Sequence, residues 1–133
     1  MDTVFLGTSR SGLTCGFSST AQQQATQVIG CITVAPNAWV NPDVLEHCIV
    51  FPKCRVAILD EQRSRILASA TDRLRSAGVE RILVMRPSRL PPGMEDLAAA
   101  SKRFEGRTKL PDVEIGPEDL SNIYYTSGLF FFY

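Results

Sequence analysis

Apolar and polar residues follow two patterns along this chain: short continuous apolar runs, and longer segments in which apolar residues recur at helical spacing. The apolar runs predict four buried strands. These are residues 31–36 (CITVAP), 55–60 (RVAILD), 80–86 (ERILVMR) and 123–125 (IYY). Residues 1–16 have no clear period and contain several turn formers, so they are read as irregular, with a short strand at Val4 to Leu6.

Helical spacing predicts four helices between the strands, each with an apolar inner face. Residues 17–30 bury Ala21, Ala25, Val28 and Ile29, and a helix beginning at Pro42 buries Val44, Leu45, Cys48 and Ile49. Residues 61–77 bury Ile66, Leu67, Ala70, Leu74 and Ala77, and residues 94–104 bury Leu97, Ala98, Ala100 and Phe104. Residues 87–93 and 105–122 are predicted loops, since proline and glycine interrupt them.

Capping residues mark the ends of these helices. The expected N-caps are Ser18 or Ser19, Asn41 ahead of Pro42, and Asp60. Gly30 and Gly78 are expected to end the first and third helices. Glu61 and Arg65 are spaced to form an ion pair on the third helix.

Alternating strands and helices predict an α/β fold with a mostly parallel sheet flanked by helices. Such sheets bind ligands at the carboxyl ends of their strands. The candidate positions are therefore Asp60-Glu61, Arg86 to Arg89, and Thr126-Ser127-Gly128. At 133 residues the chain suffices for one domain.

Composition and charge restrict the kinds of molecule that the chain is expected to bind. The chain carries 14 basic and 14 acidic residues, so charge gives no reason to expect a nucleic-acid partner. No apolar run is long enough to cross a bilayer, the N-terminus does not resemble a secretory signal, and a cytoplasmic location is expected. Seven arginines against three acids between Glu61 and Arg89 are read as a solvated helix face.

Most motifs of catalysis are missing from the sequence. His47, Cys48 and Cys54 could ligate a metal, but without a second close pair the four cysteines are read as packed, reduced thiols and no metal site is predicted. Asp60 could bind a metal or a ribose hydroxyl, although helix capping explains its position without a ligand. No dinucleotide or Walker glycine motif is present, and the single histidine supports no catalytic triad.

Thr126-Ser127-Gly128 suits a phosphate-binding turn, because glycine leaves backbone N–H groups open to an anion and the hydroxyls add donors. The stretch EDLSNIYYTSG resembles the start of the phosphate loop of the adenylate-forming superfamily, the AMP-dependent synthetases and ligases, which continues as [ST]TGxPKG. The upstream stretch ITVAPNAWVNPDVLEHCIVFPKCRVAILDEQRSRIL resembles the segment that precedes this loop in acyl-CoA synthetases. The matching residues are Pro36, Asn37, Trp39, Leu45, Glu46, Cys48, Asp60 and Glu61.

The resemblance covers residues 17–128 and implies part of an N-terminal AMP-binding subdomain. Members use ATP and Mg²⁺ to convert a carboxylate into an acyl-adenylate, which then acylates coenzyme A. Thr126, Ser127 and Gly128 carry over as a partial ATP phosphate loop, and no catalytic residue does. After Gly128 the family requires a further hydroxyl pair, a glycine and a lysine, whereas residues 129–133 are an apolar tail, LFFFY. The expectation is a truncated fragment of an acyl-activating enzyme, inactive alone and able to self-associate through an uncovered sheet face or this tail.

Two other hypotheses about function remain open. A small stand-alone α/β module could bind a partner or a nucleotide without catalysis. A small Rossmann-like oxidoreductase or a flavodoxin-like protein shares the strand–helix alternation but ranks last, because the sequence has no glycine-rich first turn.

Overall fold

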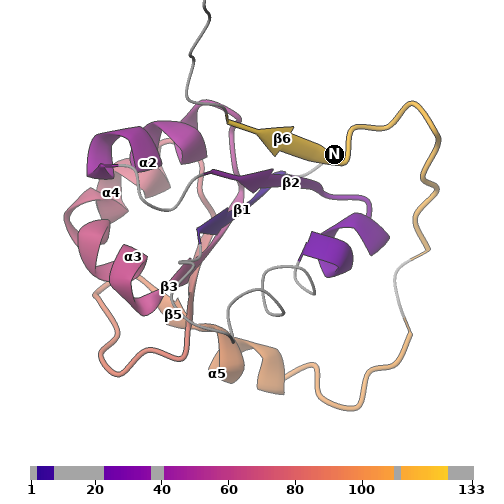
Figure 1. The fold of residues 1–133 in the computed structure, drawn as a ribbon. Helices are drawn as coiled ribbons and strands as arrows, with labels where there is room; N and C mark the ends of the chain where they lie inside the picture. Colours follow the sequence, from indigo (N-terminus) through magenta and orange to yellow (C-terminus); the bar gives the residue numbers. More distant parts are fainter. Residues whose placement is uncertain (1–2, 8–22, 37–40, 110–111, 126–133) are drawn as a thin grey trace, which may run out of the picture.

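A single parallel sheet of six strands organises the chain (Figure 1). The computed structural model describes residues 3–7, 23–36, 41–109 and 112–125. Every described strand pair is parallel, and the order across the sheet is β5-β4-β3-β1-β2-β6. The strands are β1 (Thr3–Gly7), β2 (Ile32–Ala35), β3 (Val56–Asp60), β4 (Arg81–Met85), β5 (Glu95–Asp96) and β6 (Asn122–Tyr124). The predicted α/β class with helices flanking a parallel sheet is confirmed.

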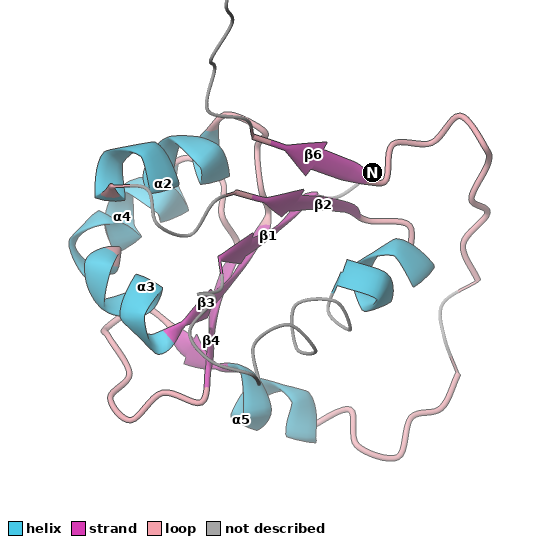
Figure 2. Cartoon of the chain, viewed as in Figure 1, coloured by secondary structure: helices cyan, strands magenta, loops and turns pink. Residues whose placement is uncertain are grey.

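Helices cover both faces of the sheet (Figure 2). One face carries α2 (Pro42–Val50), α3 (Glu61–Ile66), a 3₁₀ turn (Ala68–Ala70) and α4 (Thr71–Ser76). The other face carries the helical residues 23–28 and α5 (Leu97–Lys102). No helix in the described part of the chain is long and apolar enough to cross a membrane.

The main core lies between the sheet and the layer formed by α2, α3 and α4. Alternate residues of β3 and β4 point into it, as expected for strands that pack one face against helices. Its fully buried members include Val34, Ala57, Leu59, Ile82 and Val84 from the strands, and Leu45, Ile49, Leu67 and Leu74 from the helical layer. Ile123 and Tyr125 pack against the same cluster, which ties β6 to it.

The opposite face is held by polar contacts. Thr26 is buried, and its hydroxyl lies 2.5 Å from that of Thr33 on β2. The Gln23 amide donates to Asn122 Oδ1 at 2.8 Å and to the Tyr124 hydroxyl at 3.1 Å, which joins residues 23–28 to β6. These bonds span about 100 residues of sequence, so this helical segment is positioned by contacts that no local pattern encodes.

The helical inner faces were predicted only in part. Leu45, Cys48 and Ile49 are buried, whereas Val44 is 42% exposed. Among residues 23–28 the buried side chain is Thr26; the predicted Ala25 and Val28 are exposed, and so is Ile29 beyond them. Ala21 and the caps Ser18 and Ser19 lie outside the described residues.

The predicted helix 61–77 is broken into α3, the 3₁₀ turn and α4. Leu67, Ala70 and Leu74 are buried as expected, Ile66 is half-buried and Ala77 is exposed. The break coincides with the Thr71 hydroxyl, which donates to the Ala68 carbonyl at 3.0 Å; back-bonding of this kind commonly distorts helices.

The prediction of a helix over residues 94–104 was wrong about where the helix begins and about which of its side chains are buried. Glu95 and Asp96 pair with β4 as a short strand, so the helix begins at Leu97, and α5 contains no buried residue. Phe104 is 46% exposed, and the residue that enters the core here is Met94.

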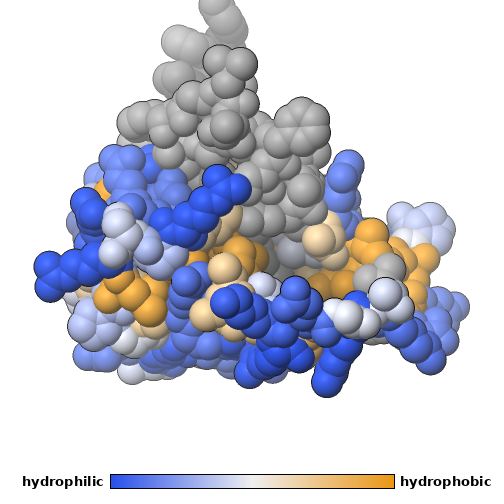
Figure 3. All heavy atoms as spheres, turned by 90° about the horizontal axis from the view of Figure 1, so that it is seen from below, coloured by the Kyte–Doolittle hydropathy of each residue, from blue (hydrophilic) through white to orange (hydrophobic). Residues whose placement is uncertain are grey.

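Exposed apolar side chains gather where the long connection meets the end of residues 23–28. The side chains of Val113 and Ile115 lie within 2.6 and 3.9 Å of the place a Cβ would occupy on Gly30. Val28, Ile29, Val113 and Ile115 are each more than a third exposed. Figure 3 shows apolar patches between charged side chains on the face that lies at the bottom of Figure 1.

The predicted caps are correct wherever the structure describes them. Val44 N–H donates to Asn41 Oδ1 at 3.0 Å, with Pro42 at the first helical position. Gly30 (φ +71°) and Gly78 (φ +102°) follow helical segments in the conformation that favours glycine. The strand predicted at Val4 to Leu6 forms as β1, so residues 1–16 are not irregular throughout.

Candidate functional site

The carboxyl edge of the sheet is the place to look for a ligand, because all six strands end there in the same direction. Asp60 ends β3, and Arg86 directly follows β4, as predicted. Thr126, Ser127 and Gly128 lie outside the described residues, which end at Tyr125, the residue after β6. Because β1 and β2 separate β3 from β6, the ends of these two strands are about 14 Å apart, three strand spacings. The sheet order therefore does not bring Asp60 and the end of β6 into contact.

Asp60 is engaged as a helix cap and as an ion-pair partner. Its Oδ1 accepts from Arg63 N–H at 2.8 Å, and its Oδ2 lies 3.2 Å from Arg63 Nη1. The capping interpretation is thus confirmed. Arg63 is 1% exposed, and its Nη1 also donates to Gln62 Oε1 at 3.0 Å. Burial of an arginine requires such partners, because an isolated buried charge is very costly.

This pair lies next to the topological switch point of the sheet. β1 and β3 are neighbours in the sheet, but the helical residues 23–28, which follow β1 in the chain, cover one face, whereas α3, which follows β3, covers the other. A crevice at the carboxyl end of such a junction is the usual ligand position in open parallel sheets. Sequence reasoning found Asp60 but missed Arg63; the three-residue spacing of the two opposite charges was the available signal.

Glu61 joins the start of α3 to the loop that follows β4. Its Oε1 accepts a short hydrogen bond from the Ser88 hydroxyl and lies 2.6 Å from Arg65 Nη2, the predicted ion pair. The Ser88 hydrogen bond is the largest of the effects that lower the pKa of Glu61, and Arg65 adds to it. The carboxylate is therefore charged at neutral pH and fixes the position of the loop.

Arg86 opens this loop in an unusual backbone conformation. Its φ is +47°, in the left-handed region that side chains other than glycine rarely adopt. Left-handed residues of this kind often occur near binding sites, where the surrounding structure holds them in place. The predicted cluster at Arg86 to Arg89 thus combines exposed cations with a constrained backbone.

Tyr125 fixes the end of β6 against the core. It packs on the buried cluster, and burial raises the pKa of its hydroxyl, with Cys48 and Cys54 adding to the rise. The residue before the proposed phosphate turn is thereby anchored on the side of the sheet covered by α2.

The geometry does not favour the interpretation of His47, Cys48 and Cys54 as metal ligands. Both cysteines are buried, and burial raises the pKa of Cys48 and takes that of Cys54 to about 12, whereas metal binding requires the thiolate. The His47 ring instead stacks on Phe51 at 5.2 Å. Within the described ranges, no group of three or more His, Cys, Asp or Glu side chains could hold a metal ion.

No protein-family model matches the chain, and a search of the curated proteins finds no match either.

Proposed function

We propose that this chain forms part of the nucleotide-binding subdomain of an ATP-dependent acyl-activating enzyme. The observation that carries the proposal is the position of β6. It pairs in parallel with β2 and ends immediately before Thr126-Ser127-Gly128, so the turn follows the carboxyl end of a parallel strand. Phosphate groups are commonly bound at that position in parallel sheets.

In this proposal the Thr126 and Ser127 hydroxyls and the Gly128 N–H donate to phosphate oxygens of ATP. Mg²⁺ would share the phosphate charge, as the resemblance implies. The lysine of the [ST]TGxPKG continuation is not among residues 129–133. Acyl transfer to ATP depends on positioning and on neutralising phosphate charge, so the 133-residue chain alone should have no acyl-activating turnover.

A chimeric enzyme tests the proposal. Residues 1–128 would be joined to the part of an acyl-CoA synthetase of known activity that begins at its [ST]TGxPKG segment. ATP–pyrophosphate exchange would be measured over fatty, aryl and short-chain acids. Exchange that is lost when Thr126 and Ser127 are both replaced by alanine supports the proposal. A monodisperse chimera that melts cooperatively but exchanges with no acid argues against it.

Reading the coding sequence downstream of codon 128 gives an independent test. A continuation as [ST]TGxPKG in any frame supports the proposal. Turnover by the 133-residue chain itself would contradict the expected inactivity.

A stand-alone α/β binding module is the second candidate. The continuous core cluster shared by β2, β3, β4, α2 and α4 favours it, since such a core could sustain an independent fold. Hydrogen exchange over residues 123–133 separates the two readings: strong protection in a monomer favours the module, and weak protection favours the fragment.

A further inference from the structure

A surface depression lies between the end of α3 and the loop that joins β4 to β5. Its volume is about 660 Å³, within the range of small-molecule sites. It is lined by Arg65, Ala68, Arg89, Leu90, Pro91 and Pro92. None of these residues belongs to the proposed phosphate turn. β4 and β6 are separated by three strands, about 19 Å in all, so the depression is distinct from that turn.

The lining has a cationic part and an apolar part. Arg65 and Arg89 come from different elements and contribute two guanidinium groups, while Leu90, Pro91 and Pro92 contribute apolar surface. Leu90 is 41% exposed, so its apolar surface is open to a ligand. A ligand that matches both parts has an anionic head and an apolar body.

The charges around the depression are unbalanced. Glu61 offsets Arg65 through their 2.6 Å ion pair. Within the described part of the chain, Arg89 and Arg86 form no ion pair, so cationic charge remains in excess here. Guanidinium groups bind phosphate through paired, charge-assisted hydrogen bonds, and a dianion satisfies two such groups together.

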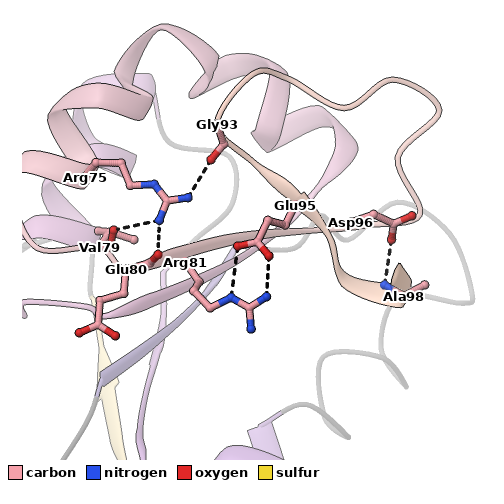
Figure 4. Close-up of polar contacts among 8 residues, drawn as sticks. All are labelled: Arg75, Val79, Glu80, Arg81, Gly93, Glu95, Asp96 and Ala98. Atoms are coloured by element: carbon pink, nitrogen blue, oxygen red, sulfur yellow. Dashed lines mark hydrogen bonds and ion pairs between the residues drawn. The ribbon is translucent and has the colours of Figure 1, made fainter. Parts of the chain in front are cut away.

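The loop is fixed at both ends, so the depression exists before any ligand arrives. Near its start, Ser88 donates to Glu61 on α3. Near its end, Arg75 Nη2 donates to the Gly93 carbonyl at 2.8 Å, while its Nη1 donates to the carbonyls of Val79 and Glu80 (Figure 4). Preorganisation of this kind reduces the entropic cost of binding.

Beyond the loop, Arg81 and Glu95 form a two-bond ion pair between β4 and β5, at 3.2 and 2.6 Å (Figure 4). This pair holds the strand into which the loop runs. The loop therefore enters and leaves through charged anchors on ordered elements.

We propose that this depression binds a phosphate monoester with an apolar or aromatic body. The phosphate contacts Arg65 and Arg89, and the body lies on Leu90 and Pro91. This site is independent of the proposed acyl-activating function.

Titration of the full chain with phenyl phosphate, followed by amide chemical shifts, tests the site. Saturable shifts are expected for Arg65, Ala68, Arg89 and Leu90. Arg89→Gln should weaken binding by about tenfold, the effect of one charge-assisted contact. Arg107→Gln removes the same charge from the exposed loop after α5 and should change the affinity by less than about twofold.

Inorganic phosphate and Leu90→Ser test the apolar part of the site. Inorganic phosphate should bind more weakly than phenyl phosphate, and Leu90→Ser should weaken only the latter. Absence of saturable shifts, equal weakening by Arg107→Gln, or equal affinity for the two phosphates would overturn the proposal. Because Arg89, Leu90 and Arg107 are all exposed, their substitution spares the core, and a cooperative melt would verify each variant.

Discussion

Substitution of Gly93 should be costly for two separable reasons. Its φ is +77°, a conformation that costs an alanine about 1–2 kcal/mol. A Cβ at this position would also lie 2.7 Å from Thr71 Cγ2, closer than atoms approach without displacement. Overpacking of this kind costs about 1–3 kcal/mol. Gly93→Ala should therefore lower the free energy of unfolding by about 2–5 kcal/mol, measured by urea denaturation.

Two variants separate the backbone term from the steric term. Gly106 has a similar φ of +82° and no heavy atom within 4 Å of its would-be Cβ, so Gly106→Ala should show only the backbone cost, about 1–2 kcal/mol. Thr71→Ser removes the clashing methyl group and retains the hydroxyl that bonds to Ala68. Gly93→Ala should cost about 1–3 kcal/mol less in the Thr71→Ser background.

Two results would contradict these expected costs. If Gly93→Ala and Gly106→Ala cost the same, the predicted contact with Thr71 does not contribute. If the cost of Gly93→Ala is unchanged in the Thr71→Ser background, the two residues are not coupled and the packing of the loop against α4 is not as described.

Three further predictions concern buried and charged groups. Asp60→Ala should destabilise the fold by about 3–5 kcal/mol in urea, because it leaves the buried Arg63 without this carboxylate; Asn41→Ala, which removes only a cap, should cost about 1 kcal/mol, and equal costs would contradict the role of the pair. The Cys54 thiol, with a pKa of about 12, should resist iodoacetamide at pH 8 in the native protein and react after unfolding; rapid labelling of the native protein would refute its burial. The Arg73 hydrogen bond lowers the pKa of Glu46, so this carboxylate stabilises the fold above its unfolded value of about 4.3 and loses that effect as the pH falls through its folded value. The difference in unfolding free energy between the wild type and Glu46→Gln should shrink over the same range, and a constant difference would count against the ion pair.

Local chemistry made the helix ends predictable from the sequence. Asn41, Asp60 and Gly78 each act through backbone groups within a few residues, so their roles do not depend on the rest of the fold. Strand identity was likewise readable for β2, β3, β4 and β6, whose apolar runs are continuous. The strand at Glu95 could not be predicted in this way, because it depends on pairing with β4 and on the contact with Arg81, 14 residues earlier.

The periodic spacing of apolar residues did not predict which polar side chains would be buried on a helical face. Arg63, Leu67, Ala70 and Leu74 follow one helical period, and all four are buried. The apolar pattern identified the last three and assigned Arg63 to the solvent side, because arginine is almost never buried without a partner. That partner, Asp60, was predicted to be a helix cap or a ligand-binding residue, and not the ion-pair partner of Arg63. Because Asp60 is both the cap of α3 and the ion-pair partner of Arg63, the capping role alone did not indicate that Arg63 is buried.

The order of the strands could not be predicted from the sequence, because it depends on contacts between residues that are far apart in the chain. β1 comes first in the chain yet lies in the interior of the sheet, between β2 and β3. A short strand was predicted at Val4 to Leu6, but nothing in residues 1–16 signals its interior position in the sheet. The position of β6 beside β2, on the opposite side of β1 from β3, likewise depends on contacts such as Gln23 with Asn122.

The order of the strands also constrains the proposed function. The described cations at the carboxyl edge follow β3 and β4, whereas the proposed phosphate turn follows β6, and the end of β6 lies about 14–19 Å from the ends of those strands. These groups therefore cannot neutralise a triphosphate held at Thr126-Ser127-Gly128. In the proposed enzyme, the resemblance assigns the balancing charge to the lysine of the [ST]TGxPKG segment and to Mg²⁺. Binding of phosphate near Arg89 and binding of ATP at the turn are accordingly separate properties, and a variant that abolishes one should leave the other intact.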